Sequence, residues 1–226
     1  MAIRVVFAED NYLVREGTSA LLRDSEDIEL VAAVEDLPAL LAAVEDGEPD
    51  AVLTDIRMPP TNTTEGIDAA REIRAKHPGV GVVVLSQFAE EDYAYDLLKE
   101  GAAGLGYLLK ERVADIDELV RALNEVARGG SILDPKVVEA LVARKDRLAH
   151  SPLAQLTDRE REVLSEMAQG KNNASIAKSL FLTERAVEKH INSLFHKLGL
   201  TEETEVHRRV MAVLAFLKQE GMAPKG

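Results

Sequence analysis

Short apolar runs alternate with helix-length amphipathic segments along the first half of this chain. The apolar runs cover residues 3–8, 28–34, 51–54, 80–85 and 104–108, and the amphipathic segments cover residues 13–23, 38–44, 66–76, 90–99 and 116–127. Apolar runs rich in β-branched residues, separated by helical segments, are typical of βαβ units and a parallel sheet. Five such units predict an α/β fold with a five-stranded, doubly wound parallel sheet.

The rest of the chain has the pattern of helices alone. Gly129 and Gly130 end the last amphipathic segment, and we expect further helices over residues 135–147, 158–169, 173–180, 184–198 and 203–218. Thr157 and Glu160 have the spacing of a capping box. Two short helices joined by a tight turn indicate a helix-turn-helix, with a recognition helix at about 184–197.

These patterns predict three parts. They are an α/β domain at residues 1–127, a linker with one helix at 128–152, and a small all-α domain of four helices at 153–218. The formal net charge is −13, and it is unevenly spread. Residues 1–150 contain 30 acidic and 16 basic side chains, whereas residues 151–226 contain 10 and 11. The acidic part should repel DNA, and the nearly neutral part can tolerate it, so we expect the two parts to have different partners.

Composition excludes several classes of protein. The chain has no cysteine, so it has no disulfide framework and no thiolate metal site. The N-terminal apolar run is too short for a signal peptide and ends in two acids. No run approaches the roughly 18 apolar residues of a membrane span. We therefore expect a soluble, cytoplasmic protein with no membrane partner.

Polar residues stand where the predicted strands end. Glu9 and Asp10 follow the first strand, Asp55 the third, Ser86 the fourth, and Lys110 the fifth. In an open parallel sheet these ends form the ligand-binding edge. Three crowded carboxylates repel one another unless a cation joins them, and Mg²⁺ prefers oxygen ligands. The set predicts a magnesium site beside a nucleophilic Asp55, with Lys110 and Ser86 suited to a phosphoryl group.

Residues 1–125 resemble the receiver domain of a bacterial response regulator. The resemblance rests on the motifs Glu9-Asp10, Thr54-Asp55-Ile56-Arg57-Met58-Pro59, Leu85-Ser86 and Tyr107-Leu108-Leu109-Lys110. It implies that a sensor histidine kinase phosphorylates Asp55. It also implies that Glu9, Asp10, Asp55 and the backbone carbonyl of Arg57 bind Mg²⁺. Ser86 and Tyr107 would be a switch pair, in which Ser86 moves to the phosphoryl group and Tyr107 turns inward.

Two residues depart from the receiver pattern. Gln87 follows Ser86 where many receivers have a small residue, so phosphoryl access or lifetime would differ. Glu111 follows Lys110 where some receivers have proline, which excludes a cis X-Pro bond there. Neither departure removes a member of the proposed site.

Other interpretations of the acidic residues stay open. A lone aspartate after a strand is often a cap or turn residue, and Glu9-Asp10 could cap the helix that follows. A phosphatase with an aspartate nucleophile needs a second acid two residues further on, where this chain has Arg57. We therefore expect a regulator and not an enzyme. A receiver that acts only as an interaction module, without phosphorylation, remains an alternative.

Residues 153–217 resemble a LuxR-type helix-turn-helix domain, through the motif Leu-Thr-x-Arg-Glu-x-Glu-Val-Leu at 156–164 and Lys-Leu-Gly-Leu at 197–200. With the receiver, the whole chain resembles a NarL/FixJ-family response regulator. The resemblance implies double-stranded DNA as a partner. The positions facing base edges would be Glu188, Lys189 and Asn192, and those facing phosphates would be Lys171, Thr183, Arg185 and Lys197. Glu188 departs from the lysine of many relatives.

The last predicted helix has a stripe of aliphatic residues. Val206, Val210, Val213, Leu214 and Leu217 lie along it, and most of this stripe should pack against the other helices. The resemblance implies that the outer part of the helix, with Val206, Val210 and Val213, joins two copies. We therefore expect a homodimer after phosphorylation, bound to paired half-sites.

Overall fold

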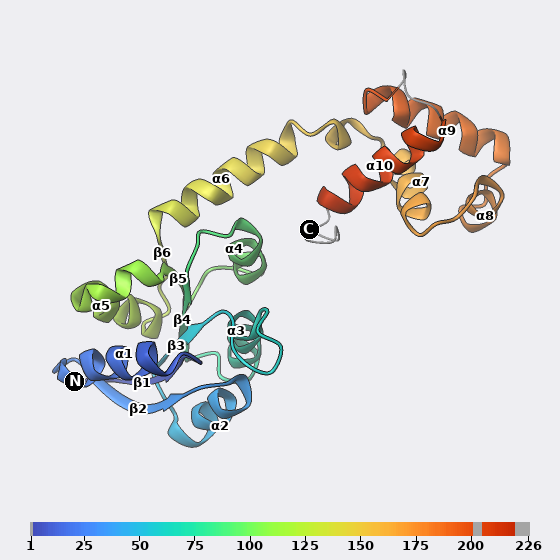
Figure 1. Cartoon of the computed structure of the whole chain (residues 1–226). Coiled ribbons are helices and arrows are strands. Elements are labelled where there is room, and N and C mark those ends of the chain that lie inside the picture. Colours follow the sequence, from blue (N-terminus) through green and yellow to red (C-terminus); the bar gives the residue numbers. More distant parts are fainter. Residues whose placement is uncertain (1, 201–204, 220–226) are drawn as a thin grey trace. The chain divides into compact units, whose positions relative to one another are not determined.

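The computed structural model describes residues 2–200 and 205–219. One parallel sheet is built from β1 (Ile3–Ala8), β2 (Ile28–Val34), β3 (Ala51–Asp55), β4 (Gly81–Ser86), β5 (Leu105–Leu109) and β6 (Ile132–Leu133). The strands lie in the order β2-β1-β3-β4-β5-β6 (Figure 1). β3 and β4 are buried along their whole length, as expected for strands covered on both faces. The predicted α/β fold class is confirmed.

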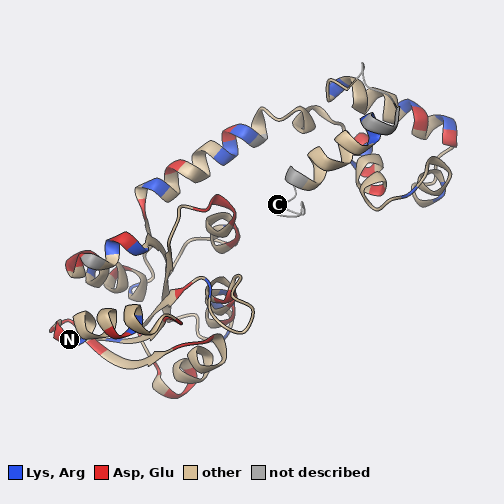
Figure 2. Ribbon diagram, viewed as in Figure 1, with Lys and Arg blue, Asp and Glu red and all other residues tan. Residues whose placement is uncertain are grey.

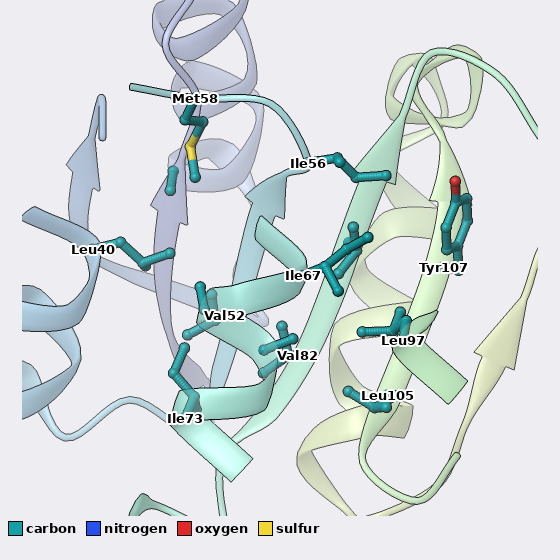
Figure 3. Packing of buried hydrophobic residues seen from close by; sticks show 14 of the residues in the cluster. Leu40, Val52, Ile56, Met58, Ile67, Ile73, Val82, Leu97, Leu105 and Tyr107 are labelled. Carbon is teal, nitrogen blue, oxygen red and sulfur yellow. The ribbon is translucent and has the colours of Figure 1, made fainter. Parts of the chain in front are cut away.

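Helices cover both faces of this sheet. They are α1 (Tyr12–Asp24), α2 (Leu37–Gly47), α3 (Glu65–Lys76), α4 (Glu91–Leu98) and α5 (Ile116–Ala127), with the 3-10 helix η1 (Lys110–Ala114). Side chains of α2, α3 and α4 pack against one face of the sheet (Figure 3), and those of α1 and α5 pack against the other. The first core includes Leu40, Ile67 and Leu97, and the second includes Leu22 and Leu123. Such two-sided burial leaves the ends of the strands as the accessible edge.

The sheet has six strands where the sequence predicted five. Ile132 and Leu133 form β6 and pair with Gly106 and Tyr107 of β5. The next helix, α6 (Pro135–Ala149), begins against the first core, the one that includes Leu40, because Val137 is fully buried there. The expected linker at 128–152 therefore contributes to the sheet domain. A strand of two residues is too short to produce an alternating pattern that sequence can reveal.

The chain divides into two compact units between Ala143 and Arg144. The second unit contains the 3-10 helix η2 (Pro152–Gln155) and the helices α7 (Asp158–Ala168), α8 (Asn173–Ser179), α9 (Glu184–Lys197) and α10 (Glu205–Gln219). Its core joins Val163, Ile176, Ile191, Leu194 and Phe216 from these four helices. The expected start of the last helix at 203 lies outside the described residues.

The second unit keeps the expected helix-turn-helix. Asn172 caps α8 and Thr183 caps α9, each accepting a hydrogen bond from the third residue of its helix. Thr157 and Glu160 form the predicted capping box at the start of α7. Within the described residues, no helix is both long enough and apolar enough to cross a bilayer.

Candidate functional site

The ends of β1, β3 and β5 bring three charged side chains together. Glu9 follows β1, Asp55 is the last residue of β3, and Lys110 follows β5. The Nζ atom of Lys110 lies 2.9 Å from Oδ2 of Asp55 and 2.8 Å from Oε2 of Glu9. Asp55 is held from its other oxygen, because Oδ1 accepts a hydrogen bond of 2.8 Å from the amide of Ile56. One ammonium group therefore serves two carboxylates.

Asp10 completes an acidic cluster at this edge. Carboxylate oxygens of Glu9, Asp10 and Asp55 all lie within 4.8 Å of one another. Glu9 is fully buried and Asp55 is 8% exposed, whereas Asp10 is exposed. Hard oxygen donors at this separation, open to solvent on one side, fit the coordination that Mg²⁺ prefers.

Electrostatics in the cluster favour an added cation. Burial raises the pKa of Glu9, and the hydrogen bond from Lys110 only partly offsets this effect. Burial likewise raises the pKa of Asp55. Burial alone would lower the pKa of Lys110, but its hydrogen bonds to Glu9 and Asp55 outweigh this and raise it. The ammonium of Lys110 thus stays charged, but it only partly compensates the negative charge of the two carboxylates.

The backbone of the acidic pair is fixed by residues that sequence reasoning did not single out. Asn11 caps α1 by accepting hydrogen bonds from Leu13 and Val14. Glu9 and Asp10 are therefore not the cap of this helix, which removes one of the open interpretations. Arg15 donates to the carbonyls of Glu9 at 2.7 Å and Asp10 at 3.2 Å. Arg15 lies only 5 residues after Asp10 in the sequence, and this short separation is the signal that could have identified its contact with the acidic pair.

A cleft of about 370 Å³ opens at Asp55. Arg57 lines it and reaches across to α4, where its Nη2 lies 2.8 Å from Oε1 of Glu90 and 3.2 Å from the hydroxyl of Tyr93. The guanidinium also lies 5.5 Å from the centre of the Tyr93 ring. Gln87, the departure noted in the sequence, is exposed and lines the same cleft. A group that approaches Asp55 passes these side chains.

Ser86 and Tyr107 share one acceptor at the side of the cleft. The hydroxyl of Ser86 donates to the carbonyl of Phe88 at 2.8 Å, and the hydroxyl of Tyr107 approaches the same oxygen at 3.5 Å. Tyr107 is fully buried in the core (Figure 3), and burial raises its pKa to about 12. The ring already occupies the inward position that the switch hypothesis reserved for the phosphorylated state. An inward turn of Tyr107 is therefore not available from this arrangement.

In the second unit, α9 presents polar side chains on the face opposite its core. Arg185, Glu188, Lys189 and Asn192 are exposed, and their spacing places them on one side of the helix. Val187, Ile191, Leu194 and Phe195 of α9 are buried. Thr183 is exposed at the helix N-terminus and accepts from the amide of Ala186. Figure 2 shows basic and acidic residues along this helix.

Two of the lysines expected to contact phosphates form ion pairs with glutamates of their own unit. The Nζ atom of Lys197 lies 2.6 Å from Oε2 of the buried Glu160. Lys171 pairs with Glu166 at 2.5 Å and also donates to Ser179. Phosphate contact by either lysine would compete with these ion pairs.

The residues expected to join two copies differ in exposure along α10. Val210 is 51% exposed, whereas Val213 packs against the core of the unit. The side chain of Val206 is not among the side chains that the structure describes. Met211 and Leu214 are about half exposed beside Val210, so the exposed apolar surface of α10 differs in part from the stripe read from the sequence.

Comparison with known proteins matches both units. Residues 5–124 match the family described as response regulator receiver domain. Residues 154–210 match the bacterial regulatory proteins of the luxR family.

Relatives of known sequence and structure span nearly the whole chain. Transcriptional regulatory protein DegU of Brevibacillus brevis is 35% identical over 220 residues, with 90% of each chain covered. DNA-binding transcriptional activator DevR/DosR of Mycobacterium tuberculosis is 30% identical, covering 90% of this chain and 91% of its own. The fold is shared with the Salmonella typhimurium response regulator RcsB, at a TM-score of 0.63, 23% identity, and coverage of 96% of this chain and 99% of that one. The chain therefore belongs to the NarL/FixJ-family response regulators, which join a receiver domain to a LuxR-type helix-turn-helix domain.

Proposed function

We propose that this protein is a transcription regulator whose binding to double-stranded DNA is controlled by phosphorylation of Asp55. A sensor histidine kinase is the donor. The observation that carries this proposal is the contact of Asp55 with Lys110 at the open end of β3, beside two further carboxylates. A regulator of transcription works where the chromosome is, which for this bacterial family is the cytoplasm.

Phosphoryl transfer needs little covalent chemistry from the protein. An oxygen of Asp55 attacks the phosphorus of the donor phosphohistidine, the phosphorus–nitrogen bond breaks, and the imidazole leaves as its nitrogen takes up a proton. The amide of Ile56 holds the Asp55 carboxylate in place. Lys110 lies close enough to transfer its hydrogen bond from Asp55 to a phosphoryl oxygen.

The acidic cluster is the proposed cation site. Glu9, Asp10, Asp55 and the carbonyl of Arg57 would hold Mg²⁺, which when bound would neutralise charge on the carboxylates and on the phosphoryl group. Without added positive charge, a phosphoryl group of about −1.5 to −2 would meet three carboxylates and one lysine. The chain's own contribution is the fixed placement of these oxygens, through Arg15 and the strand ends.

The switch would act through the carbonyl of Phe88. If Ser86 turns to a phosphoryl oxygen, its hydrogen bond to Phe88 is lost, and the Phe88 carbonyl keeps the amide of Glu90 at 2.9 Å and the long contact with Tyr107. Phe88 is 60% exposed at the start of the segment leading to α4. This segment, which would lose one of its hydrogen bonds, is the element that phosphorylation would bias, and its changed surface would join two receivers or free the DNA-binding unit.

DNA binding is assigned to the exposed face of α9. Glu188, Lys189 and Asn192 would face base edges, and Arg185 and Thr183 would contact phosphates. DevR/DosR, a relative over most of the chain, is named as a DNA-binding transcriptional activator, which supports this assignment. Val210 of α10, which is 51% exposed, would join two copies on paired half-sites.

The test compares the wild type with Asp55→Asn in the full chain. Incubation with a phosphorylated histidine kinase or with phosphoramidate should add one phosphoryl group to the wild type and none to the variant, as measured by intact mass. With beryllofluoride, the wild type alone should change its sedimentation and its gel shift on DNA. Identical behaviour of the two proteins would leave a receiver that is only an interaction module. Steady release of phosphate from small phosphate esters would instead indicate a phosphatase.

A further inference from the structure

Glu65 holds the loop that lies between β3 and α3. This glutamate is the first residue of α3 and is only 3% exposed. Its carboxylate accepts hydrogen bonds from the amides of Met58 at 3.4 Å, Thr61 at 2.9 Å and Thr63 at 2.8 Å, and from the Thr61 hydroxyl. The loop bonded in this way begins directly after Asp55 and includes Arg57, whose carbonyl is part of the proposed cation site.

The bond to Met58 reaches that carbonyl through one peptide unit. The amide nitrogen of Met58 and the carbonyl of Arg57 belong to the same peptide bond, which is not among the cis bonds of the described chain. Because a peptide unit is planar, fixing the direction of its N–H also fixes the direction of its C=O. Donation of the N–H to a carboxylate also polarises the carbonyl, so its oxygen becomes a better cation ligand.

Glu65 is itself tied to the backbone of the phosphoacceptor. The next residue, Gly66, donates its amide to the carbonyl of Ile56 at 2.9 Å. A Cβ atom at Gly66 would lie 2.0 Å from the carbonyl oxygen of Asp55, so only glycine allows this close approach. The start of α3 therefore cannot shift without moving β3. Glu65 connects a rigid support on one side with the loop on the other.

The carboxylate is charged at neutral pH. Burial alone would raise its pKa, but the hydroxyl of Thr61 and the loop amides outweigh this and lower the pKa to about 2. An ionised carboxylate only accepts hydrogen bonds, and its donors in the loop occupy it fully. It is therefore suited to holding the loop and not to transferring a proton.

We propose that Glu65 is a positioning residue of the cation site, which orients the carbonyl of Arg57 toward the carboxylates of Glu9, Asp10 and Asp55 through the Arg57–Met58 peptide. This inference rests on the cation site of the proposed function. It adds a residue that touches neither the cation nor the phosphoryl group. Groups that orient metal ligands in this way typically change metal affinity by about 10- to 100-fold when they are removed.

The experiment measures the Kd for Mg²⁺ alone by isothermal titration calorimetry of the full chain. Glu65→Gln removes the charge at constant shape. Glu65→Asp keeps the charge but shortens the side chain, so it cannot reach all of its donors. Asp68→Asn is the matched control, because Asp68 is an exposed acid in the first turn of the same helix. Its carboxylate accepts hydrogen bonds from Thr64 and Arg71 and from none of the loop amides that Glu65 holds. Thermal melts of each variant establish that it is folded.

Both Glu65 variants should bind Mg²⁺ about tenfold more weakly, and Asp68→Asn should match the wild type. The rate of Asp55 phosphorylation should recover in both Glu65 variants at saturating Mg²⁺, since the nucleophile is unchanged. Should Glu65→Gln fail to fold, Glu65→Asp decides the question.

Three results would overturn the proposal. They are wild-type affinity in Glu65→Asp, an equal loss of affinity in Asp68→Asn, or a wild type that does not bind Mg²⁺. If the wild type binds Mg²⁺ but takes no phosphoryl group, the proposed function fails while the role of Glu65 stands. If the wild type is phosphorylated and both Glu65 variants keep its Kd, only the role of Glu65 fails.

Discussion

Two buried glutamates, one in each unit, have opposite surroundings. Glu9 of the receiver is fully buried and Glu160 of the DNA-binding unit is 4% exposed. Glu160 accepts from the amide of Thr157 at 2.8 Å, the hydroxyl of Ser193 at 2.6 Å and the ammonium of Lys197 at 2.6 Å. Burial raises its pKa, but these donors lower it to about 2. Glu9 shares one lysine with Asp55, and burial raises its pKa.

The number of donors for each carboxylate explains this contrast. Glu160 is satisfied by its own domain and stabilises it, whereas Glu9 and Asp55 have fewer donors than their charge requires. A buried charge with too few partners costs folding free energy and is ready to take up a cation or exchange partners. In this comparison Glu160 is a structural element of its own unit, and Glu9 and Asp55 belong to the proposed site of phosphoryl chemistry.

The largest effect should come from removing the satisfied carboxylate. Glu160→Ala leaves Lys197 without its partner and the start of α7 without half of its capping box. We expect the DNA-binding unit to lose about 3 kcal/mol of unfolding free energy. Hydrogen exchange of the α7 and α9 amides measures this loss. Glu162→Ala is the control, because that half-exposed acid pairs with Arg159 on the same helix and should matter by less than about 0.5 kcal/mol.

Magnesium should stabilise only the unit with unsatisfied carboxylates. At tenfold excess over its Kd, Mg²⁺ should raise the unfolding free energy of the receiver by about 1.4 kcal/mol and leave the DNA-binding unit unchanged. Thermal unfolding and hydrogen exchange at constant ionic strength measure this difference. Asp10→Asn should abolish the stabilisation by Mg²⁺, since Asp10 is one of the three carboxylates that would hold the ion. Equal stabilisation of both units would mean that the effect is one of salt.

Neutralising an unsatisfied carboxylate should stabilise the fold. Asp55→Asn removes charge repulsion at constant shape, and we expect a gain of about 1 kcal/mol in unfolding free energy at neutral pH. Burial raises the pKa of Asp55 above its ordinary 3.8. The folded state of the wild type is therefore stabilised below pH 3.8, where Asp55 is protonated. That advantage is lost as the pH rises through the folded pKa.

The gain from Asp55→Asn should therefore be small at about pH 4 and grow toward neutral pH. Glu160→Gln should behave in the opposite sense. Because the pKa of Glu160 is lowered to about 2, its contribution is present above the ordinary 4.5 and is lost as the pH falls toward 2. Urea unfolding at a series of pH values measures both slopes. A gain from Asp55→Asn that is constant with pH would contradict the electrostatic account.

The strand ends were predictable because they depend on local patterns. Apolar runs locate β1, β3 and β5, and parallel strands must end at one edge, so the meeting of Glu9, Asp55 and Lys110 follows from order along the chain. The capping box of Thr157 and Glu160 was predictable for the same reason, since its two members lie three residues apart.

Features set by tertiary placement were not predictable. Lys197 meets Glu160 across 37 residues, so its place on α9 does not reveal from the sequence that it has a partner inside its own unit. The loop held by Glu65 includes Asn62 with a φ of 57°, a conformation that no periodic pattern encodes. The inward position of Tyr107 depends on its packing within the core that α2, α3 and α4 form with the sheet, which the sequence alone does not specify.

The smallest expected effect separates an exposed arginine on α9 from a paired lysine. Arg185→Ala should weaken DNA binding without lowering the melting temperature, because Arg185 is exposed, and should reduce the slope of log K against log salt by about 0.9 if one phosphate contact is lost. Lys197→Ala should lower the melting temperature, because Glu160 loses its ammonium partner, and should leave the salt slope unchanged. Fluorescence anisotropy at four salt concentrations and a thermal melt measure both. A reduced slope in Lys197→Ala with unchanged stability would show that its ion pair with Glu160 opens on DNA, and that Lys197 and Arg185 act alike.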